Sequence, residues 1–140
     1  MEIKVVEMNE EKQDSYKVRT AVFVDEQNVP PEHELDEHDE GAIHLVGYEN
    51  DTPVAASRVR FLNDYGKLER ICVLKEHRGK HFGVEMIEKM EDVIQRAGYS
   101  KAKLNAQDHA IAFYERLNYR PVSDVFMDAG IPHVTMIKEL

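Results

Sequence analysis

The sequence predicts a mixed α+β fold, in which helices flank a central sheet of mostly antiparallel strands. Two patterns along the 140 residues indicate it. In the first half, apolar and polar side chains alternate as they do along half-buried strands, and short turns separate the segments. After Lys75 the apolar residues recur about every 3.6 positions, as on one face of a helix. The expected order of elements is β-α-β-β-β-α-β-α-β-β.

The first half begins with a strand expected at residues 2–8, where the alternation is clear. A helix is expected over Asn9–Phe23, with the asparagine as N-cap, and an Asn-Val-Pro-Pro sequence ends it. Three strands follow at residues 43–49, 54–61 and 67–74, joined by turns rich in Asn, Asp, Gly and Pro. Connections this short favour an antiparallel meander.

The second half begins with a helix whose apolar stripe runs from Phe82 to Ala97, and Gly98 is placed to end it. A strand is expected at residues 100–107, followed by a short helix through Leu117. Two final strands are expected at residues 119–123 and 133–138, which completes the predicted sheet.

The composition favours one folded domain over residues 1–140, because this length suits a single core and no repeat or linker divides the chain. No segment approaches the roughly 18 apolar residues of a membrane span. The first residues lack the basic and apolar blocks of a secretory leader. The single cysteine, Cys72, excludes an internal disulfide and multi-cysteine zinc sites. We therefore expect a cytoplasmic protein outside the membrane.

The charge is acidic and unevenly distributed. A net charge of −9 argues against general binding of nucleic acid, which needs a basic surface. Residues 25–40 hold eight Asp or Glu and no Lys or Arg, whereas residues 67–80 hold five Lys or Arg and two Glu. The asymmetry fits an anionic ligand and a cationic ligand at different places, although each patch can also be a solvated face.

The junction at residues 73–84 is a candidate anion site, because a strand there runs into a helix through H-R-G-K-H-F-G. The first N–H groups of a helix are free and carry a partial positive charge, so they attract anions. Arg78 and Lys80 add charged donors, and Gly79 and Gly83 let the backbone approach a ligand closely. Pyrophosphate is the natural ligand, and the alternative is an ordinary turn that contains glycine.

Residues 78–84, R-G-K-H-F-G-V, resemble the pyrophosphate loop of the GNAT family of N-acetyltransferases, usually Arg/Gln-x-x-Gly-x-Gly/Ala. Arg78 and Gly83 match this pattern, and His81 stands where the family usually has its first glycine. L-E-R-I-C-V at residues 68–73 is similar to the central strand of the family. L-N-A-Q and then A-x-x-F-Y-E-R-L-x-Y, within residues 104–119, are similar to the strand and helix that follow.

Three further motifs resemble the ElaA-like bacterial subgroup of this family. They are R-x-x-V-F-V-x-E-Q-x-V-P at residues 19–30, the acids Glu34, Asp36 and Asp39, and D-A-G-I-P-H at residues 128–133. The resemblance covers nearly the whole chain. It implies the GNAT fold and the transfer of an acetyl group from acetyl-CoA to an amine, with acetyl-CoA as co-substrate and no metal. Family habit would also allow a homodimer.

The resemblance implies that the backbone of Ile71, Cys72 and Val73 pairs with the pantetheine arm like an added strand. An exposed strand edge can do this because its N–H and C=O groups are unpaired. The sheet would splay between this strand and residues 100–107. The other residues expected to contact the cofactor are Arg78, Gly79, Lys80, His81, Phe82, Gly83, Val84, Asn105 and Phe113. Asn105 could equally be a structural amide that bridges strands.

Acetyl transfer needs a group that takes a proton from the amine and a group that protonates the leaving thiolate. Glu69 is the candidate base, directly or through water, because alternation would place it on the same face as Ile71 and Val73. A strand carboxylate paired with a nearby base is the alternative. The resemblance implies that Tyr114 is the acid, whereas the apolar stripe alone favours a core tyrosine.

Four residues are candidates for binding a cationic acceptor amine: Glu26, Asp36, His44 and His133. Arg19 is a candidate for bracing the acidic loop by ion pairing. Two other classes of function remain open. His33 and His38 with His44 could form a metal site, although their spacing is not that of helical ligands. A non-catalytic acyl-CoA-binding module would keep the anion site without a working base.

Overall fold

The computed structural model describes all 140 residues, and its elements follow the predicted order with small additions. The helices are α1 (Asn9–Arg19), α2 (Pro31–Glu34), α3 (Phe82–Arg96) and α4 (Ile111–Glu115). The strands are β1 (Glu2–Val5), β2 (Ile43–Glu49), β3 (Thr52–Leu62), β4 (Tyr65–Val73), β5 (Lys101–Gln107), β6 (Arg120–Pro121), β7 (Phe126–Asp128) and β8 (Ile131–Glu139). None of the helices combines the length and the apolar sequence needed to cross a bilayer.

The eight strands form one mixed sheet, which confirms the predicted sheet type and adds β7 to the seven strands expected. Its order is β1-β2-β3-β4-β5-β8-β6, and β7 pairs with β8 as a hairpin. Every pair is antiparallel except β4 with β5, which run parallel because α3 connects them. The sheet therefore has two antiparallel halves that meet at one parallel junction.

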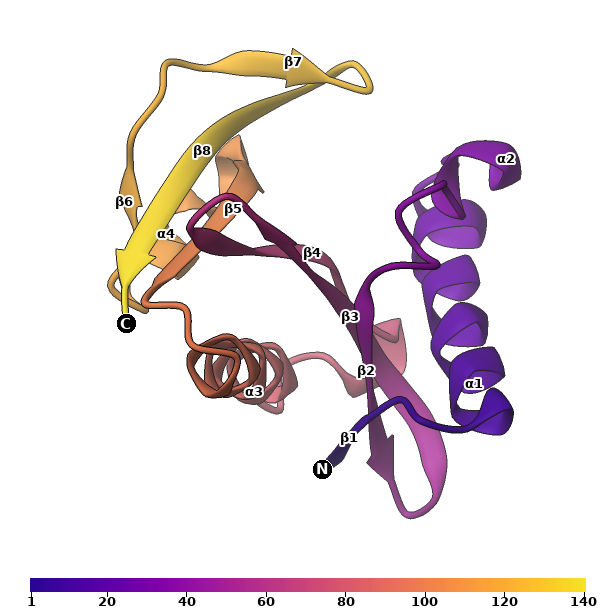
Figure 1. Cartoon of the computed structure of the whole chain (residues 1–140). Helices are drawn as coiled ribbons and strands as arrows, with labels where there is room; N and C mark the ends of the chain where they lie inside the picture. The colour runs from indigo at the N-terminus through magenta and orange to yellow at the C-terminus, as the bar shows by residue number, and fades with distance from the viewer.

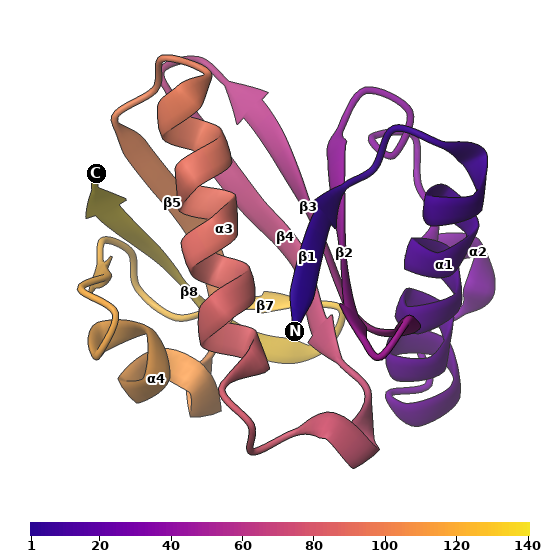
Figure 2. The same cartoon turned by 90° about the horizontal axis from the view of Figure 1, so that it is seen from below.

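Two helices cover opposite faces of the first half of the sheet, α1 on one side of β2 to β4 and α3 on the other (Figure 1). The apolar stripe of α3 buries Met86, Ile87, Met90 and Ile94 in the main core. By contrast, the buried face of α1 includes the polar side chains Ser15 and Arg19. This explains why its apolar pattern is weak in the sequence. Figure 2 shows α3 lying along the sheet, with α4 beside the C-terminal strands.

Three local features differ from the predicted elements. Helix α1 continues as a π-helical segment over Thr20–Glu26, and the predicted acidic loop contains the short helix α2. Pro31 begins α2 at the position where a proline's missing N–H costs nothing. A third difference is β7, which turns back onto β8 through Ala129 and Gly130, both with positive φ. Residues predicted as loop thus acquire structure from packing.

A β-bulge at Arg70 changes which way the end of β4 faces. Ala56 of β3 lies opposite Cys72, but Arg58 lies opposite Glu69, so β4 has one residue more than β3 between these pairs. Arg70 takes up the extra residue with a φ of 56°. The alternation therefore reverses there, and the prediction that Glu69 shares a face with Ile71 is wrong. Ile71 packs against the α3 core, whereas the Glu69 carboxylate bonds to Arg58 on the α1 side.

The sheet opens at its parallel junction, which confirms the predicted splay. Only Gly66 with Ala102 and Lys67 with Lys103 are paired between β4 and β5. Gly66 is needed at this point, because a Cβ atom there would lie 2.5 Å from Ile94 Cγ1 of α3. Beyond this pairing the strands separate, and the edge of β4 that faces β5 has no strand partner.

Candidate active site

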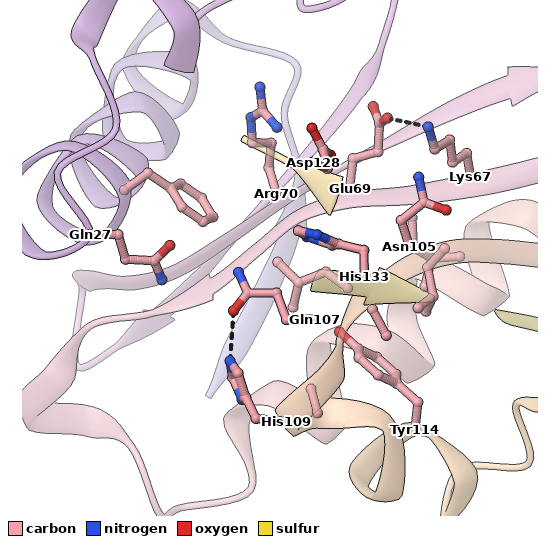
Figure 3. A pocket seen from close by; sticks show the side chains of 16 residues that line it. Gln27, Lys67, Glu69, Arg70, Asn105, Gln107, His109, Tyr114, Asp128 and His133 are labelled. Carbon is pink, nitrogen blue, oxygen red and sulfur yellow. Dashed lines mark hydrogen bonds and ion pairs between the residues drawn. The ribbon is translucent and has the colours of Figure 1, made fainter. Parts of the chain in front are cut away.

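Two pockets meet where β4 and β5 separate. The first, about 440 Å³ and here called the α3 groove, is lined by residues 71–73, 77–79 and 81–84 with Val22, Gln27 and Phe113. The second, about 360 Å³ and here called the β5 pocket, is lined by residues 67–71 and 104–107 with Phe23, Gln27, His109, Ala110, Tyr114, Asp128 and His133 (Figure 3). Gln27 and Ile71 line both, so a ligand in one pocket can reach the other.

Unpaired backbone N–H groups line the α3 groove. The N–H groups of residues 79 to 84 donate to no carbonyl of the chain, and Glu85 makes the first bond of this turn, to the His81 carbonyl at 3.1 Å. Gly79 and His81 both have left-handed backbone, with φ of 82° and 63°. Histidine is among the side chains that tolerate this conformation best, so it can replace a glycine here. The arrangement suits a bound anion.

The two basic side chains of this loop point to different partners. The Arg78 guanidinium forks onto the Glu26 carboxylate at 2.7 and 2.6 Å, and its Nε donates to the Val73 carbonyl at 3.0 Å. The Lys80 ammonium instead donates to Glu49 at 3.2 Å and does not line the groove. Glu26, a predicted acceptor-binding residue, is therefore bound to Arg78 and lines neither pocket.

The helix after β5 contributes one aromatic ring to each pocket. Phe113 lines the α3 groove and Tyr114 lines the β5 pocket. Burial raises the pKa of the Tyr114 hydroxyl to about 12, and this hydroxyl has no hydrogen-bond partner within the chain. It is therefore a protonated donor available to a ligand. Asn105 lines the β5 pocket too, where its Oδ1 accepts from the Thr135 hydroxyl at 2.9 Å, so it also bridges strands.

Glu69 lines the β5 pocket but is held by three cations. Its carboxylate lies 2.9 Å from Arg58, 3.3 Å from Arg60 and 3.1 Å from Lys67. Burial alone would raise its pKa, but the charges of Arg58 and Lys67 outweigh that effect and lower it. The carboxylate is consequently a weak proton acceptor. Its surroundings match the alternative considered from the sequence, a strand carboxylate paired with nearby basic residues.

The acids of the predicted acceptor loop are engaged by buried arginines. Arg19 donates to Glu34 at 2.8 Å and to Asp39 at 2.6 Å, which confirms that it braces this loop. Arg58 donates to Asp36 at 2.8 Å and to Asp39 at 2.9 Å. Asp36 lines neither pocket. Most of the negative charge of this motif is thus neutralised inside the protein, where it organises the wall behind Glu69.

His44 belongs to the same buried cluster. Its Nε2 lies 2.7 Å from the Asp39 carbonyl, and burial lowers its pKa. It lines neither pocket, so of the four predicted acceptor residues the structure brings only His133 to the β5 pocket. His33, His38 and His44 do not converge with other side chains into a group arranged to hold a metal ion.

Several residues of the β5 pocket escaped the sequence reasoning. They are Gln27, Lys67, Arg70, Gln107, His109 and Asp128. Strand register could have identified one of them, because Gln107 lies directly opposite His133 on β8. Strand alternation could have identified Lys67 too, because it lies two residues before Glu69 on β4. The remaining four lie at a helix end, a bulge, a 3-10 turn and a hairpin, which leave no periodic signal. Cys72 lines the α3 groove, but burial raises the pKa of its thiol to about 12, as expected of an inert side chain.

Comparisons with known proteins agree with this geometry. The acetyltransferase (GNAT) domain family matches residues 7–140. The chain is 46% identical over 137 residues to the uncharacterised N-acetyltransferase YjcF of Bacillus subtilis, covering 96% of this chain and 98% of that protein. It is 32% identical over 129 residues to the protein ElaA of Escherichia coli, covering 88% and 84% of the two chains.

The solved structures agree as well. The crystal structure of Escherichia coli ElaA superposes with a TM-score of 0.87 at 27% identity, covering 99% of each chain. An aminoglycoside 6′-N-acetyltransferase solved with coenzyme A superposes with a TM-score of 0.76 over 99% of this chain and 97% of that one. At 16% identity this second likeness shows the fold alone. The chain therefore belongs to the GNAT family of acetyltransferases, in its ElaA-like group, and is an acyltransferase.

Proposed function

We propose that this protein transfers the acetyl group of acetyl-CoA to an amine by direct attack. The observation that carries the proposal is the meeting of the two pockets at Gln27 and Ile71. One pocket offers unpaired backbone donors for an anion, and the other offers a protonated tyrosine beside polar side chains. A thioester placed at the junction would have the cofactor on one side and the acceptor on the other.

The α3 groove fits the phosphate end and the pantetheine arm of acetyl-CoA. The free N–H groups of residues 79 to 84, at the start of a 15-residue helix, would hold the pyrophosphate together with Arg78. The β4 edge at Ile71 to Val73 has no strand partner on the β5 side, so the amide groups of the pantetheine arm can pair with it. An N–H of Cys72 or Val73 would donate to the thioester oxygen.

Tyr114 is the proposed acid. Because its hydroxyl stays protonated and makes no bond within the chain, it can donate to the thiolate as the C–S bond breaks. Glu69 lines the same pocket, but its ion pairs weaken it as a base. We propose that Glu69 acts only through water, by orienting a molecule that carries protons out of the pocket.

Calorimetric titration of the purified protein with acetyl-CoA, CoA and dephospho-CoA tests the cofactor site. We expect saturable binding of acetyl-CoA that weakens when the ribose phosphate is missing. Thiol release from acetyl-CoA in the presence of amines then tests transfer. Absence of any acetyl-CoA binding would contradict the proposal, and binding without thiol release for any amine would indicate an acyl-CoA-binding module instead.

A further inference from the structure

His133 is held in one tautomer by a backbone bond. Its Nδ1 lies 2.7 Å from the carbonyl oxygen of Ile131. A carbonyl oxygen only accepts hydrogen bonds, so we assign the proton to Nδ1. In the neutral ring Nε2 then carries a lone pair, and it has no partner within the chain. This nitrogen is a proton acceptor that nothing in the protein uses.

The ring is also fixed in position within the β5 pocket. It stacks on Phe126 with a centroid distance of 6.0 Å and an interplanar angle of 24°, and it lies opposite Gln107 in the β5–β8 register. Figure 3 shows it in the middle of the labelled side chains, with Glu69 and Asp128 on one side in this view and Tyr114 on the other. His133 and Tyr114 thus line one pocket from two different elements.

The other ionisable groups of the pocket are poorer proton acceptors for an amine. Lys67 and Arg70 are cations, and Glu69 is held by three ion pairs. The second pocket histidine, His109, donates from Nε2 to the Gln107 side-chain oxygen at 2.6 Å and keeps a lone pair on Nδ1, but it is exposed, whereas His133 is half-buried. Asp128 lines the same pocket and makes no ion pair within the chain.

We propose that His133 Nε2 is the direct proton acceptor for the attacking amine, an assignment that rests on the proposed acetyl transfer. The neutral amine forms a C–N bond to the thioester carbonyl carbon, and the proton that its nitrogen loses passes to Nε2. As the C–S bond breaks, the sulfur takes the electron pair and receives the Tyr114 proton. The imidazolium returns its proton to the tyrosinate through water, so both side chains are regenerated.

The test compares wild type with His133→Gln, which removes the basic nitrogen and keeps a polar side chain. Thiol release is followed between about pH 5 and 9 with spermidine, L-lysine and a lysine-containing peptide as probes, since histidine ordinarily changes charge in this range. We expect kcat to fall on the order of 100-fold or more and its acidic limb to disappear, with acetyl-CoA affinity unchanged. His38→Gln, on an exposed loop outside both pockets, is the matched control.

Glu69→Gln and an NMR measurement make the outcome decisive. Under the proposal Glu69→Gln keeps the acidic limb, and the nitrogen shifts of the neutral His133 ring show a protonated Nδ1. The proposal is overturned if His133→Gln keeps the wild-type rate and pH profile, or if Nε2 carries the proton. In either case acetyl transfer by the wild type would still stand. If no probe amine releases thiol with the wild type, the proposed function and this assignment fail together.

Discussion

Replacing Arg19 by methionine is expected to destabilise the fold, because it removes one partner of a buried ion cluster. The Arg19 side chain is 0% exposed, and those of its partners Glu34 and Asp39 are only 2% and 7% exposed. Removing one partner of a buried pair typically costs about 3 to 5 kcal/mol. Arg58 still reaches Asp39 at 2.9 Å and Arg70 reaches Glu34 at 3.6 Å. We therefore expect the lower end, about 3 kcal/mol, or a melting point lower by roughly 10 °C.

The loss of stability caused by Arg19→Met should also depend on pH. Burial alone would raise the pKa of Asp39, but hydrogen bonds from Arg19 and from the Asp36 N–H lower it strongly. A carboxyl whose pKa is lower in the folded state stabilises the fold above its unfolded pKa, about 4, and this contribution is lost as the pH falls below that value. Arg19→Met removes one of the hydrogen bonds that lower this pKa. The difference in free energy of unfolding between wild type and variant should therefore become smaller below about pH 4.

Thermal unfolding followed by circular dichroism measures both effects. Arg96→Met is the matched control, since the Arg96 side chain is 80% exposed and pairs with Asp92 along the same helix at 2.9 Å. A surface pair of this kind contributes about 0.5 kcal/mol or less. If Arg19→Met melts within about 3 °C of Arg96→Met at neutral pH, the buried cluster is not a source of stability and the reasoning is refuted.

Two further predictions concern the pockets. Tyr114→Phe should lower kcat by about 100-fold or more while leaving stability unchanged, because the lost hydroxyl makes no bond within the chain. Tyr119→Phe is its control, because the Tyr119 hydroxyl donates to Glu91 at 2.8 Å outside both pockets. This change should lower stability by about 1 kcal/mol and leave kcat unchanged. Equal rates for both variants would contradict the assignment of Tyr114 as the acid. Gly83→Ala should weaken acetyl-CoA binding without destabilising the fold, since the nearest atom to an added Cβ is 3.8 Å away, whereas Gly41→Ala, with nothing within 4 Å and outside the groove, should bind normally. Unchanged affinity of Gly83→Ala in calorimetric titration would show that no ligand approaches the backbone there.

Periodicity predicted those elements whose buried faces are apolar. Strand β2 has the predicted bounds, and the α3 stripe is the stripe that packs in the core. The apolar pattern of α1 is weak because its buried face carries Arg19, and a buried charge cannot be distinguished from an exposed one by spacing. Its partners lie 15 and 20 residues further along the chain. Only folding brings them together.

The candidate site likewise contains some features that the sequence predicted and others that only the tertiary structure revealed. The candidate anion site is a continuous segment, so its glycines, its bases and the start of its helix were visible in order. The assignment of Glu26 and Asp36 to a cationic acceptor rested on charge alone, and the structure places both with arginines. Charge density along a sequence does not indicate which charges are neutralised, because the cations that pair with them come from other elements.

By itself, the sequence determined the order of the elements and the candidate anion site at residues 73–84, because each depends on residues that are neighbours in the chain. The choice of Tyr114 rested on the family resemblance, since its apolar stripe alone favoured a core tyrosine. The tertiary structure decided which way the end of β4 faces and which groups meet in the β5 pocket. The bulge at Arg70 depends on the register between β3 and β4. Glu69, Tyr114 and His133 lie far apart in sequence and meet only because β4 and β5 separate, so no local pattern could have brought them together.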